Sequence, residues 1–496
     1  MNTETVLADI VASVTEILKE TVNQAGEDMK QPTLYTLEEQ THAALLRIGQ
    51  VIVQGLVAGQ GSGLVGSTRP CGCGAQQTYH DQAHPLQVMT SLGKVCLEQR
   101  AWYQCASCGA SSYPLDEQVG LAPVGRMSRY LQEQCGWLLA VLPTRLAQQA
   151  LARFGWPVVA ASQVREHGEA LGAELEEYLQ DRLACAQREA GDLPAKAPSP
   201  RQPPSAERLY AAPDGVMYCT TEREEETGKV RWRELKVAAV YEATPAKAMP
   251  EPAQEAAPVQ LPVRTRIRRW LGEEAPDLPV APPDQAVRVT YVAETGPWEH
   301  LGPRLWGELW ERGLLRSVQD LVVVADGSDH IDQVVDNDLR VPGIHVTRIL
   351  DIAHAQQHLW AVSKGAFGEG NTAGVTWVQP LLTSLEHGAV DEIVASLEAL
   401  RAGRAAMRPE VAELARKAAG YFQQRREQVR YPHFVAAGYQ IGSGLAESAC
   451  KRFGTDRMKG AGMRWTVHGA QCVATLRMFV LSERWGEVSD YCRKAA

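Results

Sequence analysis

Three features are missing from this chain of 496 residues. It has no apolar run that approaches the ~20 residues needed to cross a bilayer, so we expect no membrane-spanning helix and no membrane partner. Its first residues, MNTETVLADI, contain neither a basic nor an apolar leader, so we expect a cytoplasmic protein. It also has no excess of positive charge, because 59 acidic residues outweigh 50 lysines and arginines and give a net charge of −9.

What is present indicates several folded domains. Hydrophobic residues make up 45% of the chain, which is ample for packed cores, and the length suits three or four domains. A negative net charge argues against a nucleic-acid partner, but this total averages over all domains, whereas a binding surface is local. From Arg401 to Arg477, fourteen lysines and arginines face five acidic residues, a local balance of +9. The chain therefore contains a basic region although its net charge is negative.

Of the eleven cysteines, one group has the spacing of metal ligands. It consists of two close pairs about 30 residues apart, namely Cys71, Cys73, Cys105 and Cys108. Such pairs converge on a tetrahedral zinc ion when the chain between them forms a hairpin, so we predict a zinc-ribbon-like module at 67–126. The first pair, Cys-x-Cys, is more closely spaced than the usual Cys-x-x-Cys. A ribbon that no longer binds metal is therefore the alternative, and His80 or His84 could replace one sulfur as a ligand. We expect the other seven cysteines to be small core residues.

Helical apolar spacing predicts two further modules in the first part of the chain. One is an N-terminal helical segment at 1–66, and the other is a helical module at 127–189. In the second, a break at Phe154-Gly-Trp-Pro157 separates two helices in the manner of a helix-turn-helix. This arrangement would offer Ser162, Gln163 and Arg165 to DNA, and plain helix packing is the alternative.

Proline marks the next two segments. Fifteen of the 28 prolines lie between residues 190 and 285, where they exclude helix interiors and central strands. We therefore predict a Pro-rich linker at 190–206 and a Pro-rich insertion at 243–284. The insertion carries four arginines within Arg264–Arg269, which form either a phosphate contact or a solvated cluster.

Five strand-like segments follow the linker. They are Leu209–Thr221, Trp232–Tyr241, Val287–Val292, Leu321–Ala325 and Ile344–Leu350. The first three follow one another with no room for long helices except in the Pro-rich insertion, a helical stretch at Trp298–Gly313 comes next, and strands and helices then alternate. This is the element order of the ribonuclease H-like fold.

Acidic residues fall where that fold needs them. Asp214 lies in the first strand, Asp326 ends the apolar fourth strand, and Glu447 lies about one turn into a helix that Ser443 could cap. Three carboxylates that converge could hold two Mg²⁺ (or Mn²⁺) ions and cleave a phosphodiester. Each aspartate could instead belong to an ordinary Asp-Gly turn, but their placement on the strand order favours a catalytic role.

The motifs of the second half resemble those of a known family. They are Val-Ala-Asp326-Gly, Leu350-Asp-Ile-Ala-His-Ala-Gln-Gln-His-Leu-Trp360, Gly442-Ser-Gly-Leu-Ala-Glu-Ser, Arg457-Met-Lys-Gly-Ala-Gly-Met-Arg-Trp465 and the closing Leu476-Arg with Arg484-Trp485. The chain from Asp326 through Trp485 resembles the ISKra-type bacterial insertion-sequence transposases, relatives of the Mutator-like DDE group. The paired cysteines before Tyr113-Pro-Leu-Asp116 fit the N-terminal half of that family.

The resemblance implies a DDE transposase, an enzyme of DNA transposition and recombination in the bacterial cytoplasm and nucleoid. It would bind the terminal repeats of its element, cleave there and join the ends to target DNA, as a homo-oligomer on paired ends. Its catalytic and Mg²⁺-binding residues would be Asp214, Asp326 and Glu447. Asp351-x-x-His354 resembles the family's Cys/Asp-x-x-His motif and would support the site. A structural pair is the alternative, and Asp351 is also a rival of Asp326 as the second metal ligand.

Positive charge follows Glu447 closely. Five basic residues there are predicted to bind DNA phosphates rather than form a generic basic surface, and they are Lys451, Arg452, Arg457, Lys459 and Arg464. Trp465 is either a stacking platform for a base or a core residue. A helical insertion domain, 353–440, is implied before the last catalytic helix, and its arginines either track DNA or are solvated.

The sequence thus predicts a multidomain α/β protein. A ribonuclease H-like catalytic core, 207–352 and 441–490, carries an all-helical insertion and follows the helical, zinc-ribbon-like and helix-turn-helix-like modules. Two other functions stay open. One is a non-catalytic DNA-binding protein derived from a transposase, and the other is a ribonuclease H-like nuclease without strand transfer.

Overall fold

The computed structural model describes residues 3–27, 33–121, 126–157, 159–192, 208–243, 286–403 and 408–494. Most of the Pro-rich linker and insertion, including the Arg264–Arg269 cluster, lies outside these residues. The chain divides into two compact units, Met1–Glu177 with Gln471–Ala496 and Tyr178–Ala470. The last residues thus belong to the first unit, whereas the sequence assigned residues up to 490 to the catalytic domain.

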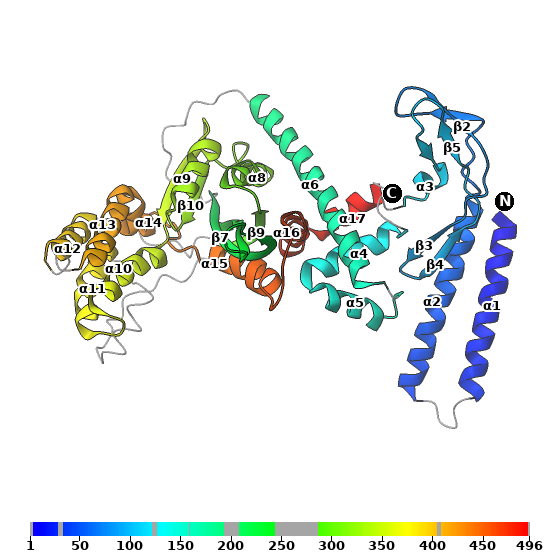
Figure 1. Cartoon of the computed structure of the whole chain (residues 1–496), viewed down its shortest axis with the longest axis horizontal. Helices are drawn as coiled ribbons and strands as arrows, with labels where there is room; N and C mark the ends of the chain where they lie inside the picture. The colour runs from blue at the N-terminus through cyan, green and yellow to red at the C-terminus, as the bar shows by residue number, and fades with distance from the viewer. Residues whose placement is uncertain are drawn as a thin grey trace. The chain divides into compact units, whose positions relative to one another are not determined.

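The first unit begins with an antiparallel helical hairpin of α1 (Thr3–Glu27) and α2 (Leu34–Gly59), as Figure 1 shows. Thr33 caps α2 by accepting the N–H of Thr36 at 3.3 Å, and α2 ends at Gly59. Judged by length and composition alone, α2 is the one helix of the described ranges that could cross a membrane. A core helix of a soluble protein can pass the same test, so the expectation that the chain has no membrane-spanning helix stays a prediction.

Two small sheets follow the hairpin. The four strands of the first pair antiparallel in the order β1 (Thr68–Pro70), β2 (Gln76–Tyr79), β5 (Tyr103–Cys105) and β6 (Ser111–Ser112). The second is a hairpin of β3 (Leu86–Thr90) and β4 (Gly93–Leu97). The turns β1–β2 and β5–β6 carry the two cysteine pairs, as predicted for a ribbon.

Helices complete the first unit. They are α3 (Pro114–Gln118), α4 (Arg129–Val141), α5 (Thr144–Arg153), the first part of α6 (Ala161–Asp192), most of α16 (Val467–Leu481) and α17 (Trp485–Lys494). Leu131, Leu151 and Val164 bring α4, α5 and the start of α6 into one core. The C-terminal helix joins them, because the Trp485 indole donates to Glu133 of α4 at 3.1 Å.

A five-stranded sheet forms the centre of the second unit. Its strands are β7 (Arg208–Arg223), β8 (Val230–Ala243), β9 (Ala286–Glu294), β10 (Asp320–Ala325) and β11 (His345–Leu350). Their order across the sheet is β11-β10-β7-β8-β9. The strands β7, β8 and β9 pair antiparallel, whereas β10 is parallel to both β7 and β11. Each strand lies within two residues of its predicted ends.

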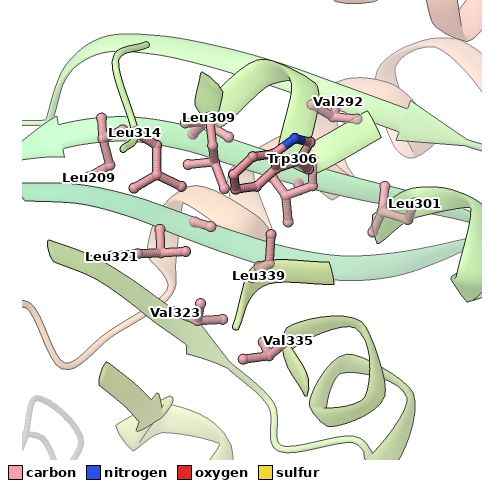
Figure 2. Packing of buried hydrophobic residues seen from close by; sticks show 14 of the residues in the cluster. Leu209, Val292, Leu301, Trp306, Leu309, Leu314, Leu321, Val323, Val335 and Leu339 are labelled. Atoms are coloured by element: carbon pink, nitrogen blue, oxygen red, sulfur yellow. The ribbon is translucent and has the colours of Figure 1, made fainter. Parts of the chain in front are cut away.

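Apolar side chains from alternate positions of the sheet form its main core. Leu209, Leu321 and Val323 of the strands pack against Leu305 and Leu309 of α8 (Trp298–Glu311), and all five are buried. Figure 2 shows Leu209, Leu309, Leu321 and Val323 of this core together with Trp306. The core also includes residues of α9 (Asp329–Val334) and the π-helix η1 (Val335–Leu339). Because the central strands are buried, they read in the sequence as almost continuous apolar runs.

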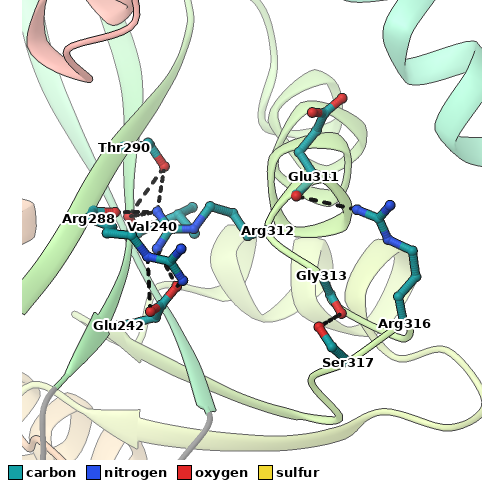
Figure 3. A network of polar contacts seen from close by, with 9 residues as sticks. All are labelled: Val240, Glu242, Arg288, Thr290, Glu311, Arg312, Gly313, Arg316 and Ser317. Carbon is teal, nitrogen blue, oxygen red and sulfur yellow. Dashed lines mark hydrogen bonds and ion pairs between the residues drawn. The ribbon is translucent and has the colours of Figure 1, made fainter.

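The end of α8 is tied to the sheet edge by a polar network (Figure 3). Arg312 donates to the carbonyl of Val240 at 3.3 Å, to the Thr290 hydroxyl at 3.1 Å and to Glu242 at 2.9 Å. Burial works against ionisation of Glu242, but Arg312 and Arg288 hold the pKa of this carboxyl below its usual range. The network fixes β8 and β9 against the helix.

Helices separate β11 from the remaining part of the second unit. They are α10 (Ile352–Phe367), α11 (Thr372–Glu386), α12 (Val390–Ala402), α13 (Pro409–Gln424), η3 (Arg426–Val429) and α14 (Tyr431–Ala436). No strand occurs among the described residues of this segment, which matches the predicted all-helical insertion. The chain then returns to the sheet as α15 (Gly444–Cys450) and the π-helix η4 (Lys451–Met458), which adjoin β7.

Candidate active site and metal centre

Two predicted catalytic aspartates lie just beyond the residues that pair two neighbouring parallel strands, β7 and β10. Val323 of β10 pairs with Ala211 of β7, and Asp326 and Asp214 each lie three residues further along. The same register links β10 to β11, where Ala325 pairs with Leu350, so Asp351 is level with Asp326. The sheet therefore brings three carboxylates to the carboxyl end of its parallel strands β10 and β11 and the adjoining part of β7.

Asp214 is half-buried, and its Oδ1 accepts the N–H of Gly215 at 2.7 Å. Burial raises the pKa of Asp214, and the charge of Asp326 raises it further. The Cys450 thiol, by hydrogen bonding, and His354, by its charge, lower that pKa in part. These interactions show that residues from β7, the end of β10, α10 and α15 meet at one place.

Asp326 occupies the exit of β10, as predicted. Its Oδ1 accepts the N–H of Ser328 at 2.8 Å, and its backbone carbonyl accepts the Tyr421 hydroxyl at 2.7 Å. Gly327 turns the chain with φ of +75°, and a Cβ there would lie 2.6 Å from Nε of Arg425. Glycine is therefore required directly after the carboxylate.

Asp351 has a different environment from Asp326. It is 3% exposed and caps α10, with Oδ1 accepting the N–H of His354 at 2.9 Å. Its Oδ2 accepts both the N–H and, at 2.5 Å, the hydroxyl of Ser443. Both oxygens are therefore engaged within the protein, which favours a positioning role for Asp351 over its rival role as a metal ligand.

Glu447 lies exposed on α15, one turn after Ser443, and α15 packs on β7 and β8. Ser443 occupies the N-cap position, but its hydroxyl bonds to Asp351 instead of capping the helix. The described carboxylates do not meet as tightly as the cysteines do, since only the cysteine group has three or more ligand atoms all within 4.8 Å of one another. A pair of metal ions spans a wider donor set, because the ions themselves lie ~3.5–4 Å apart.

The predicted DNA-binding residues fall into two groups. Lys451, Lys459, Arg464 and, in the first unit, Arg165 are exposed. Arg452 donates to the Tyr291 hydroxyl at 2.9 Å. Arg457 is 2% exposed and its guanidinium lies 4.8 Å from the centre of the Trp465 ring, which favours packing over phosphate contact.

Trp465 and the helix-turn-helix residues are also placed by hydrogen bonds. The indole of Trp465 donates to the carbonyl of Met458 at 3.0 Å, and the ring is half-buried, as expected for a packing residue. At the start of α6, the side chain of Gln163 accepts the N–H of Ala160 at 3.0 Å, so Gln163 acts as a local cap. Ser162 beside it is exposed.

The arginines of the helical insertion make internal contacts. Arg425 is 5% exposed, bonds to Asp329 at 2.8 Å and stacks on Tyr421. Arg401 pairs with Glu398 of its own helix and Arg430 with Glu427 of the preceding η3, each at 3.1 Å. Arg426 pairs with Asp391, Arg408 donates to a backbone carbonyl, and Arg404 lies outside the described residues.

The four predicted cysteines form the clearest site. Sγ of Cys71 lies 3.6 Å from Sγ of Cys108, and Sγ of Cys73 lies 3.7 Å from Sγ of Cys105. A Zn–S bond of ~2.3 Å with tetrahedral angles requires sulfurs ~3.8 Å apart. The group therefore fits a metal ion such as zinc, and all four ligands are thiols.

Electrostatics and the nearby histidines agree with this ligand set. The backbone N–H of Cys108 is the main cause that lowers the pKa of Cys105 to about 6, which favours its thiolate form. The backbone N–H of Ala110 lowers the pKa of Cys108, but the three other thiols outweigh it and raise this pKa to about 12, so a bound cation is needed for all four to ionise. His80 instead stacks on Trp102, and His84 pairs with Asp81 at 3.1 Å. Neither histidine is needed as a fourth ligand.

Several residues of the candidate active site were not singled out from the sequence. Cys450 was expected to be a plain core thiol, yet it hydrogen-bonds to Asp214. Its position three residues after Glu447, on the same side of α15, is the signal that could have found it. Tyr421 and Arg425 hold the turn at Asp326. They lie almost a hundred residues after Asp326 in the chain, and no sequence pattern links them to it. Among the other cysteines, Cys185 is exposed, so its expected core position is wrong.

Comparison with models of known protein families and with curated proteins found no match to this chain.

Proposed function

We propose that the chain is a DDE transposase with a ribonuclease H-like catalytic core. The sheet order β11-β10-β7-β8-β9, with three antiparallel strands followed by two parallel ones, supports this core. An all-helical segment between β11 and α15 agrees with the insertion implied by the family resemblance. The reaction would be Mg²⁺- or Mn²⁺-dependent cleavage at the ends of an insertion sequence and their transfer to target DNA.

One observation carries the proposal. Asp214 and Asp326 each lie three residues after the last paired residues of the adjacent parallel strands β7 and β10, and the segment that enters the Glu447 helix is bonded to Asp351 at the end of the next strand. This arrangement gathers acidic groups from distant parts of the chain, which a set of unrelated Asp-Gly turns would not do. The raised pKa of Asp214 reflects the charge of Asp326 as well as burial.

The donor set suits hard divalent cations, because carboxylate oxygens are the ligands that Mg²⁺ and Mn²⁺ prefer. Asp214, Asp326 and Glu447 would hold the ions. Bound there, the ions would supply activation of the attacking oxygen and stabilisation of the leaving oxygen. No covalent protein intermediate is needed, since water or a 3′-OH attacks the phosphodiester in line.

Other residues of this chain would prepare the site. Asp351 fixes the entry of α15 and thereby the position of Glu447. Exposed Lys451, Lys459 and Arg464 would bind backbone phosphates next to the carboxylates. Arg165 and the helix-turn-helix would bind the terminal repeats, and pairing of two ends would involve at least two copies.

Replacing Asp326 tests the proposal. The substrates are duplexes that carry the two DNA stretches flanking the chain's own gene, incubated with Mg²⁺ or Mn²⁺. We expect Asp326→Asn to lower cleavage by ~10³-fold or more, because a lost metal ligand removes several kcal/mol of transition-state stabilisation. DNA affinity should change less than about twofold.

Asp391→Asn is the matched control, because Asp391 is an exposed aspartate of the helical insertion and should leave cleavage unchanged. Wild-type cleavage by Asp326→Asn would overturn the proposal. Cleavage without joined products would leave a nuclease, and DNA binding without any cleavage would leave a non-catalytic DNA-binding protein.

A further inference from the structure

The α1–α2 hairpin exposes apolar side chains along its length. Eight of them are 38–72% exposed, namely Leu7, Val11, Leu18, Val22, Leu34, Leu45, Ile52 and Leu56, and we call this set the hairpin stripe. Large apolar residues are usually exposed singly on a protein surface. A series of them along two paired helices indicates a surface that a partner covers.

The inner line of the hairpin is defined by its closest contacts. A Cβ on Gly55 would meet Ile10, and one on Gly59 would lie against Val6, so the start of α1 packs on the end of α2. Ile17 and Ala44 are buried in the middle of the hairpin. The two helices are therefore antiparallel, as Figure 1 shows.

Members of the stripe follow these inner positions by one residue. Leu7 follows Val6, Leu18 follows Ile17, and Leu45 follows Ala44. One residue rotates the side-chain direction by ~100° around a helix. Because the helices are antiparallel and face each other, the same rotation sense points both sets to the same side of the hairpin. The stripe is thus one continuous face built from both helices.

The opposite face of the hairpin is already covered. Gln54 precedes Gly55 by one residue, so it points to the other side, where it donates to the carbonyl of Cys96 in β4 at 2.8 Å. Gln50, one turn earlier, donates to the carbonyl of Lys94 at 2.7 Å. The small sheet occupies that side, whereas no described residue covers the stripe.

We infer that the hairpin stripe binds the same stripe of a second copy of this chain and forms a four-helix bundle. From the exposed fractions, the stripe presents roughly 900 Å² of surface, close to the ~800 Å² per partner of a stable interface. A two-fold axis matches one apolar face with its own copy, which is the commonest oligomer symmetry. This inference is independent of the proposed catalysis.

A lipid surface fits the stripe less well. Helices that lie on membranes are rich in lysine and arginine beside their apolar face, because these residues contact anionic lipids. The sequence of α1 contains five acidic residues and one lysine. The covered side of α2 donates through glutamines to β4, which suits a helix packed between protein surfaces.

Sedimentation equilibrium of the full chain, without DNA, tests the inference. We expect the wild type to form a dimer of 54.3 kDa chains and Val11→Glu with Val22→Glu to raise its dissociation constant ~100-fold or more. The matched control is Ala12→Glu with Asn23→Glu, which puts the same charges one residue further around the same helix. The control should dimerise as the wild type does.

The milder pair Val11→Thr with Val22→Thr keeps the shape of both side chains. It covers the case in which the glutamate variants fail to fold, and circular dichroism would detect such a failure. It should weaken the dimer by a smaller factor. A monomeric wild type at tens of micromolar, or a dimer that tolerates both stripe variants, would overturn the inference. The inference would also be overturned if the wild type did not self-associate but bound vesicles of phosphatidylcholine and phosphatidylglycerol, and if the stripe variants lost this binding.

Discussion

At the scale of single residues, the two neighbouring aspartates Asp326 and Asp351 have opposite environments. Asp351 is buried and accepts three hydrogen bonds, from His354 and twice from Ser443. Asp326 is half-buried, and its carboxylate accepts the N–H of Ser328. Since each buried donor left without a partner costs ~1–3 kcal/mol, we expect Asp351→Ala to lower the free energy of unfolding by about 3 kcal/mol.

Asp326→Ala should lower it by less than about 1 kcal/mol, because its loss also relieves repulsion with Asp214. Urea denaturation followed by circular dichroism measures both values, with the exposed Asp391→Ala as control. Equal losses for the two variants would mean that Asp351 does not connect α10 to the entry of α15.

His167 gives a residue-scale prediction on pH. This side chain is 3% exposed in α6, and burial lowers its pKa, with Glu166 acting partly against this shift. A histidine whose pKa is lower in the folded state stabilises the fold above its unfolded pKa of ~6.5, and that contribution is lost as the pH falls below it. The unfolding free energy of the wild type should therefore fall more steeply from pH 7 to pH 5 than that of His167→Gln.

Thermal or urea unfolding at a series of pH values measures this difference. The exposed His42→Gln should keep the wild-type slope. If the slopes of the wild type and His167→Gln coincide, protonation of other groups accounts for the acid sensitivity.

At the scale of elements, the ribbon of β1, β2, β5 and β6 is held together by the two cysteine turns. The sheet is too small to have a large apolar core, so metal binding should supply much of its stability. We expect about one zinc ion per chain by elemental analysis, lost in Cys105→Ser and retained in the exposed control Cys185→Ser. Chelation should expose the ribbon to protease. Full zinc content in Cys105→Ser would contradict this assignment.

These elements also show what a sequence can and cannot predict. The ribbon and the five strands of the large sheet were predictable, because ligand spacing and apolar runs are local signals. The contacts that complete the candidate active site were not. Ser443 bonds to Asp351 across 92 residues and Tyr421 to Asp326 across 95, so they depend on how the helical insertion packs, and no local pattern encodes that.

At the scale of the whole molecule, the structure sorts the positive charges that the sequence only counts. The basic region from Arg401 to Arg477 contains buried arginines such as Arg425 and Arg457, whose partners are protein groups. Lys451, Lys459 and Arg464 remain exposed on η4 and the segment after it. A DNA duplex can reach the second group, so phosphate binding by an acidic protein would depend on few residues.

This division predicts how DNA affinity depends on salt. Each phosphate contact contributes ~0.9 to the slope of log affinity against log salt concentration. We expect Lys459→Ala and Arg464→Ala each to weaken binding to the flanking-sequence duplex and to reduce the slope by about 1.

Arg457→Ala should instead lower the free energy of unfolding, because it empties a buried position beside Trp465. Lys417→Ala, an exposed residue of α13, is the control for both measurements. Unchanged slopes for Lys459→Ala and Arg464→Ala would show that the exposed charges after Glu447 do not contact the backbone, and DNA binding would then rest on the helices of the first unit.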